Sequence, residues 1–324
     1  MPTTPVNSTT TSTLSNLIQV AYDKYIEFNL RSEPMFRKFA DKKPVDVTNP
    51  GNTVVFQVYT DLSRVTAALT QTQDPDAVTL NNTDKVNVIV DEYGNSVLTT
   101  ERLALESLSA IDPAVADMLS YNMRDSLDAF VWAKLTGLAT GRFTGTTTAD
   151  ESTVNGEDVS ASTSAPYITA ALARKAVAKL RGASVQPRDG GMYTALIHPD
   201  VSFDLRSEAA SGGNTPWQLP HTYTEAGVGN LWNGEIGIFD QIRYIETPRA
   251  EVLSGSGVDS VYGTVILGKQ ALVEAVSYEP KTVIGPVTDK LMRFRPAGWK
   301  GLLGWNIYRP EARYVIQTKS TIAS

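Results

Sequence analysis

The chain has 324 residues, of which 42% are hydrophobic and 20% are charged, the ordinary composition of a globular protein. Its formal net charge of −6 excludes a general basic field that would draw it to nucleic acid or to an anionic membrane. The absence of cysteine excludes disulfides, thiolate nucleophiles and cysteine zinc sites, and no apolar run approaches the roughly 18 residues of a membrane span. We therefore expect a protein of cytosolic origin with no membrane partner.

The N-terminal segment changes character at Leu14. Residues 1–16 carry no charged side chain and are mostly Thr, Ser, Asn and Pro, a composition that buries too little apolar surface to order itself. From Leu14 to Ile26, apolar residues follow the three-and-four spacing of an amphipathic helix. This helix either packs on its own domain or reaches a neighbouring subunit, and the sequence leaves both alternatives open.

Two strands are predicted between Asn49 and about Glu101, because the hydrophobic period there becomes two. One alternating run extends from Val54 to Tyr59 and the other from Val86 to Asp91. The polar segment that joins them, residues 60–85, is much longer than the usual connection of about 4–6 residues. It is predicted to be a projecting hairpin whose contacts lie on another molecule.

The strongest helical pattern covers residues 113–136. Asp112 is a suitable N-cap, Pro113 occupies the first helical position, and Gly137 follows the last turn. At 1.5 Å per residue such a helix would span on the order of 36 Å. A long spine is therefore predicted.

A second helix is predicted over residues 166–181, and its basic residues have two explanations. Arg174, Lys175, Lys179 and Arg181 could face DNA, or they could complement the negative C-terminal end of the helix dipole. The second explanation is favoured.

Short strands and turns dominate from Met192 onward, with one short helix opening at Pro199-Asp200. The predicted strands are "MYTALIH", "GEIGIFD", "IRYIET", "VYGTVIL", "MRFRPAGWK", "GWNIYRP" and "ARYVIQTKS". An N-terminal helical spine and a strand-rich second half predict a mixed α+β protein.

The stretch "YGTVILGKQ", residues 262–270, places Gly263, Gly268 and Lys269 in the order of a phosphate-binding P-loop. However, Gln270 stands where the motif needs Ser or Thr for Mg²⁺, and Thr-Val-Ile-Leu favours an extended strand over a phosphate cradle. A strand and turn are therefore expected, and a nucleotide-binding enzyme is kept as an alternative.

Other catalytic and metal sites find little support in the sequence. The two histidines, His198 and His221, do not have the spacing of metal ligands. His198, Asp200 and Ser202 lie too close in sequence for a nucleophile triad, and an Asp-capped helix start explains them better. No catalytic residue, cofactor or metal is expected.

The order of these elements resembles the major capsid proteins of tailed double-stranded DNA bacteriophages, which have the Hong Kong 97 fold. Two stretches, "TALIHPDVSFDLRSEAA" and "VGNLWNGEIGIFDQIRYIET", are similar to the central part of the axial domain in these coats. The stretch "RFRPAGWKGLLGWNIYRPEARYVIQTKS" is similar to their closing peripheral strands. The resemblance extends from about residue 14 to residue 320.

The resemblance implies a division of the chain into regions with assembly roles. It gives residues 1–48 as an N-terminal arm, 49–101 as an extended β-hairpin loop, 102–190 as a peripheral domain with spine helix 113–136, 191–270 as an axial domain, and 271–324 as the returning peripheral strands. The implied function is self-assembly into pentamers and hexamers that form an icosahedral head around packaged double-stranded DNA. The implied location is the virion, with assembly in the host bacterial cytoplasm.

The resemblance also implies partners and contacts. Because the arm is short, we expect a separate scaffolding protein, together with a portal, a possible decoration protein and non-specific contact with packaged DNA. Lys85 has no identifiable crosslinking partner, so no covalent crosslink is expected. An encapsulin-like shell around a cargo enzyme is the nearest alternative. The candidate contacts between subunits are Tyr22, Tyr25, Phe56, Tyr59, Arg64 and Trp232.

Overall fold

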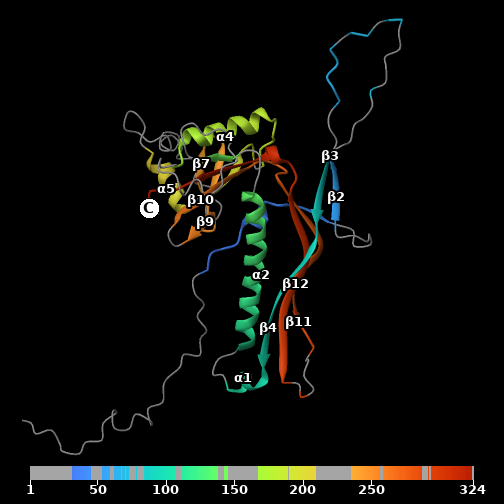
Figure 1. Ribbon diagram of the computed structural model, residues 1–324, viewed down its shortest axis with the longest axis vertical. Helices are drawn as coiled ribbons and strands as arrows, with labels where there is room; N and C mark the ends of the chain where they lie inside the picture. The colour runs from blue at the N-terminus through green and yellow to red at the C-terminus, as the bar shows by residue number, and fades with distance from the viewer. Residues whose placement is uncertain are drawn as a thin grey trace, which may run out of the picture.

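The protein is elongated, with a narrow lower part built from one long helix and one sheet, and a broader upper part built around a second sheet, as the computed structural model in Figure 1 shows. The structure describes residues 31–44, 53–58, 84–106, 111–137, 142–144, 167–188, 190–208, 235–255, 258–286 and 293–322, with residue 291 and short pieces between residues 62 and 78. The predicted helix over residues 14–26 lies outside them.

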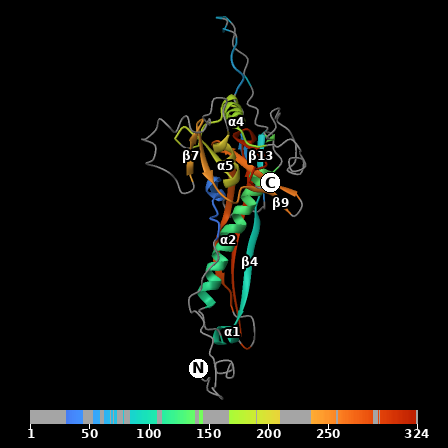
Figure 2. The same ribbon diagram turned by 90° about the vertical axis from the view of Figure 1, so that its left-hand side faces the viewer.

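The predicted spine is confirmed as helix α2, Ile111–Thr136. Its 26 residues span about 39 Å at 1.5 Å per residue. The helix begins two residues earlier than expected, so Asp112 and Pro113 lie in its first turn. At its other end the Gly137 N–H donates to the Ala133 carbonyl at 3.0 Å. Figure 2 shows α2 and strand β4 running side by side along the lower part.

The lower part is a four-stranded sheet that packs against α2. Its order is β1 (Asp41–Pro44), β11 (Leu272–Ile284), β12 (Phe294–Ile307) and β4 (Asp91–Thr100), followed by the short helix α1 (Glu101–Glu106). Strand β1 is parallel to β11, and the other pairs are antiparallel. The two predicted strands "MRFRPAGWK" and "GWNIYRP" are one strand, β12, because its glycines allow neighbouring backbones to approach closely without interrupting the ladder.

The upper part is a seven-stranded sheet. Its order is β5 (Arg142–Thr144), β13 (Arg313–Thr318), β10 (Val258–Leu267), β6 (Tyr193–Ile197), β8 (Ile242–Glu246) and β7 (Glu235–Phe239), with β9 (Glu251–Gly255) also paired to β10. Helices α4 (Ala170–Gly182) and α5 (Pro199–Ser207) accompany it. The last strand, β13, thus lies among the elements of residues 191–270 and not with the other closing strands.

The two strands predicted for the hairpin are confirmed as β2 (Thr53–Val58) and β3 (Asp84–Ile89). They pair antiparallel from Thr53 opposite Ile89 to Val58 opposite Asp84. In Figure 1 the described pieces between them lie beyond the end of this two-stranded sheet, away from the rest of the chain.

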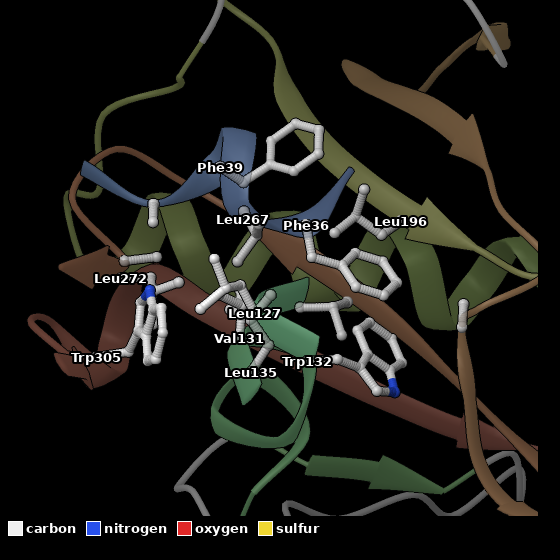
Figure 3. Packing of buried hydrophobic residues seen from close by; sticks show 14 of the residues in the cluster. Phe36, Phe39, Leu127, Val131, Trp132, Leu135, Leu196, Leu267, Leu272 and Trp305 are labelled. Carbon is white, nitrogen blue, oxygen red and sulfur yellow. The ribbon is translucent and has the colours of Figure 1, made fainter. Parts of the chain in front are cut away.

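One of the buried apolar clusters joins the upper and lower parts (Figure 3). The C-terminal half of α2 contributes Leu127, Val131 and Leu135, which cluster with residues of both sheets. The 3₁₀ turn η2 (Phe36–Phe39) closes this core, and the Phe36 ring stacks on Trp132 with centroids 4.4 Å apart. The two sheets are therefore fixed to each other by η2 and the spine helix.

Candidate assembly surfaces

The projecting hairpin presents apolar side chains to solvent. Leu62, Val65 and Leu69 are all exposed, with Val65 82% accessible, and Arg64 between them is exposed as well. Grouped exposed apolar side chains mark surfaces that bind other molecules. The hairpin is therefore one candidate contact surface.

The root of the hairpin is anchored within its own subunit. The Phe56 ring meets Tyr308 edge-on at 6.5 Å, and the Lys43 ammonium lies 4.6 Å and 4.0 Å from the centroids of these two rings. The Asn306 side-chain amide donates to the Asn87 carbonyl at 2.7 Å. These contacts fix the direction in which the hairpin leaves the body.

A second exposed apolar surface lies at the lower end of the four-stranded sheet, which we call the distal end. Strand β12 brings Pro296 opposite Leu98 and Ala297 opposite Ile284, and the Glu101 N–H donates to the Arg293 carbonyl at 2.9 Å. A recess of about 460 Å³ opens there. The exposed apolar residues of the distal end are Leu98, Leu103, Leu105, Ile284 and Leu291.

The part of the predicted arm around residues 35–37 is clasped to the spine by buried charges. The backbone N–H groups of Met35 and Arg37 donate to the Asp128 carboxylate at 3.2 Å and 3.1 Å, and the Arg249 Nε lies 3.3 Å from it. Burial raises the pKa of the Asp128 carboxyl, although these donors oppose the shift. The Arg37 Nε donates to buried Glu274 at 2.6 Å. The clasp fixes where the arm leaves the body.

Only two of the six predicted contact residues can be placed. Phe56 is half-buried at the hairpin root, and Arg64 is exposed on the projecting part. Tyr22, Tyr25, Tyr59 and Trp232 lie outside the described residues. The distal end was missed by sequence reasoning, because isolated leucines beside turns look the same whether they are buried or exposed.

The P-loop-like stretch is a buried strand and a turn, as the sequence predicts. Residues 264–267 belong to β10 and are buried. The N–H groups of Gly263, Gly268 and Lys269 donate to the carbonyls of Ala250, Ala312 and Gln186 at 2.7–3.1 Å. Backbone donors that a phosphate cradle would need are thus already bonded within the protein.

The helix predicted to open at Pro199-Asp200 is confirmed as α5, but the capping residue is different. The cap is His198 and not Asp200: its Nδ1 accepts from the Asp200 N–H at 3.2 Å, because Pro199 takes the first helical position. The imidazole ring stacks on the Tyr262 ring with centroids 4.3 Å apart. Burial lowers the pKa of the imidazole, and the negative charge of Asp200 opposes this shift. Ser202 instead donates to Glu246, so the three residues do not form a triad.

Within the described part of the chain, no three His, Asp or Glu side chains gather as a metal site would need. His221 lies outside that part. None of the described helices is long and apolar enough to cross a membrane.

A comparison with protein families identifies the kind of protein that carries these surfaces. The profile described as "Phage capsid protein" matches residues 9–309, nearly the whole chain. The chain belongs to the phage capsid protein family. The capsid protein is therefore a structural shell component. No curated protein sequence matches it.

Solved structures confirm the fold of the capsid protein. It superposes on a chain from the head of Helicobacter pylori bacteriophage KHP40 with a TM-score of 0.69 at 15% identity, covering 98% of this chain and 99% of that one. The superposition on the capsid of Ralstonia phage GP4 has a TM-score of 0.68 at 14% identity and covers 97% of this chain and 99% of that one. The superposition on the cyanophage Pam1 capsid has a TM-score of 0.68 at 14% identity and covers 94% of this chain and 97% of that one. The predicted α+β Hong Kong 97-like fold is thus confirmed.

The family match also bears on the alternatives. The phage capsid family favours a virion shell over an encapsulin-like compartment and over a nucleotide-binding enzyme. A virion location for the capsid protein follows from the same match.

Proposed function

We propose that the capsid protein assembles into pentamers and hexamers that close into an icosahedral head around packaged double-stranded DNA. The observation that carries the proposal is the projecting hairpin, which points away from the described body of the chain and carries the exposed residues Leu62, Val65 and Leu69. In a capsomer, the hairpin lies across the adjacent subunit and buries these side chains there. Apolar burial contributes about 25 cal/mol per Å², and repetition around a closed ring adds such contacts together.

The distal end supplies a second contact. Ile284 is 82% accessible and Leu105 is 80% accessible at the tip of an elongated subunit, farthest from the upper sheet. In the proposed shell this end meets the corresponding ends of subunits from neighbouring capsomers. A projecting hairpin and an apolar tip give one subunit contacts both within and between capsomers.

The regions of the chain take the following roles in this proposal. The upper sheet forms the axial domain around the capsomer centre, and the four-stranded sheet with α2 forms the peripheral domain. Residues 1–48 form the arm and 49–101 the extended loop. Because β13 pairs with β10, β5 pairs with β13, and α4 packs on the same sheet, we assign residues 142–144, 170–182 and 313–318 to the axial domain and retain the other predicted boundaries.

The predictions about specific partners rest on the resemblance to tailed-phage capsid proteins. They are a scaffolding protein, a portal, a possible decoration protein, contact with packaged DNA, and assembly in the host cytoplasm without covalent crosslinks. On α4, the Arg174 Nε is paired with the Asp240 carboxylate at 2.6 Å, which agrees with a structural use of that cation. Boiled particles are expected to give a single band of monomer mass.

Hairpin removal tests the proposal. The full chain is expressed with its genomic neighbours, and a variant replaces residues 60–83 by a short Gly-Ser turn between β2 and β3. We expect DNA-containing shells from the full chain, and from the variant a folded subunit with the same thermal unfolding but no shells, as measured by sedimentation and negative-stain electron microscopy. Closed shells from the variant, or small oligomers only from the full chain, would contradict the proposal. Shells that hold one enzyme and no DNA would favour the compartment.

A further inference from the structure

A recess of about 250 Å³ opens where the C-terminal half of α2 lies beside the junction of β3 and β4. Asn87, Ile89, Asp91 and Tyr93 alternate along one strand face and line one wall, while Phe130 and Lys134 from α2 line the other. Trp305 of β12 also lines it. The wall residues come from four elements of the folded subunit, β3, β4, α2 and β12, so the recess is preformed.

Three aromatic rings meet at this recess. The centroids of Tyr93 and Phe130 lie 4.6 Å apart, those of Tyr93 and Trp305 5.7 Å, and those of Phe130 and Trp305 6.1 Å. Trp305 is buried, whereas Phe130 is 40% exposed. Ring faces carry negative electrostatic potential and attract a cation placed within about 6 Å of the centroid.

The charges around the rings also favour a cation. The Asp91 carboxylate lines the recess. The pKa of the Tyr93 hydroxyl is raised, mainly by burial and in addition by the negative charge of Asp91. On the inner side, the Trp305 indole N–H donates to buried Glu274 at 3.2 Å, which increases the electron density of the ring. Lys134 is exposed, so its stem can line the recess while its ammonium stays in water.

The projecting hairpin carries one cation that suits this recess. Arg64 is the only basic residue between Tyr59 and Thr83, and it is exposed. Its neighbours Leu62 and Val65 are exposed apolar residues, and so is Ile89 at the rim of the recess. A guanidinium stacks on aromatic faces and forms two parallel hydrogen bonds with a carboxylate. Figure 1 shows the hairpin pointing away from its own body, so its partner recess belongs to another copy.

We infer that Arg64 of one subunit enters the recess of an adjacent copy, stacks on the rings of Tyr93, Phe130 and Trp305, and pairs with Asp91. The same contact places Leu62 and Val65 against Ile89. This inference rests on the proposed function, because it names the residues by which the hairpin engages the neighbouring subunit.

A double-mutant cycle in assembled particles tests the contact. Arg64→Gln and Asp91→Asn are made singly and together, and the free-subunit concentration that coexists with particles is measured by sedimentation. Each single variant is expected to raise this concentration on the order of tenfold, and the double variant no further than either single one. Lys85→Gln, which removes one positive charge from the root of the same hairpin, is the matched control and is expected to leave it unchanged.

The outcomes separate this contact from the proposed function. If particles form normally and the two single effects are absent or simply additive, the contact is wrong while the shell function stands. If the wild-type chain forms no particles, the proposed function itself fails. Thermal unfolding of the unassembled variants should match the wild type, because Arg64 and Asp91 are both exposed in the free subunit. A particle map that places Arg64 away from the three rings would also overturn the inference.

Discussion

Gly304 shows how a single residue sets the junction between the hairpin and the body. A Cβ at this position would collide with the carbonyl group of Ile89, which is backbone and has no room to move. Gly304→Ala is therefore expected to destabilise the subunit by about 1–3 kcal/mol, the usual effect of overpacking. Gly182→Ala is the control, because a Cβ there meets nothing within 4 Å, and an alanine at a helix end is neutral or stabilising. Urea unfolding of unassembled subunits measures both, and equal stabilities for the two variants would contradict the account.

His198 gives the subunit a predicted pH dependence. Burial lowers the pKa of its imidazole below the ordinary value of 6.5. A depressed folded-state pKa means that the unfolded chain takes up the proton first, so the contribution of His198 to stability is present above about pH 6.5 and is lost as pH falls through the folded pKa. We expect the free energy of unfolding to fall less between pH 7.5 and pH 5 in His198→Asn, which keeps a side-chain cap for α5. The same pH slope in both proteins would contradict this role.

At the scale of elements, the clasp between η2 and α2 is expected to be a main source of stability. Phe36 is 1% exposed and stacks on Trp132, so Phe36→Ala should cost about 3–5 kcal/mol through lost burial and a cavity. Phe203 on α5 is 49% exposed, and Phe203→Ala should change stability by less than about 0.5 kcal/mol. Denaturant unfolding compares the two variants. A similar small loss of stability in both variants would mean that η2 is not clasped to α2.

The elements that the sequence predicted correctly share strong local signals. Helix α2 has a long apolar face and a closing glycine, and α5 has proline at its first position. Strand β1, "DKKP", could not be predicted, because it is polar and exists through parallel pairing with β11 across more than two hundred residues. Strand β12 was divided in two for a related reason: its glycines signal turns locally, and only the neighbouring backbones reveal why they are needed.

The candidate surfaces were predictable to different degrees. The length and polarity of residues 60–85 indicated a projecting hairpin, and Arg64 lies on it. Phe56 carried the same alternating pattern as any half-buried strand residue, and its nearest aromatic partner, Tyr308, is distant in sequence. The distal end and the aromatic recess depend on which side chains the fold leaves uncovered, which no local pattern contains.

At the scale of the whole molecule, the apolar distal end is expected to matter for shells and not for the subunit. Leu105→Ser with Ile284→Ser should leave thermal unfolding within the small range typical of exposed substitutions, because both side chains are about four-fifths accessible. The same double variant should yield free capsomers in place of closed particles in sedimentation. Val97→Ser on the neighbouring strand β4, at a less exposed residue, provides the comparison. Normal shells from the double variant would remove the distal end from the assembly contacts.

The measurement that tests the account most directly is a high-resolution electron cryomicroscopy reconstruction of particles from the full chain expressed with its genomic neighbours. The account predicts a closed icosahedral shell in which the hairpin, residues 60–83, crosses an adjacent subunit and the upper sheets surround each capsomer axis. A shell whose hairpins fold back on their own subunits would contradict the proposed mechanism of assembly. The absence of any closed particle would contradict the proposed function.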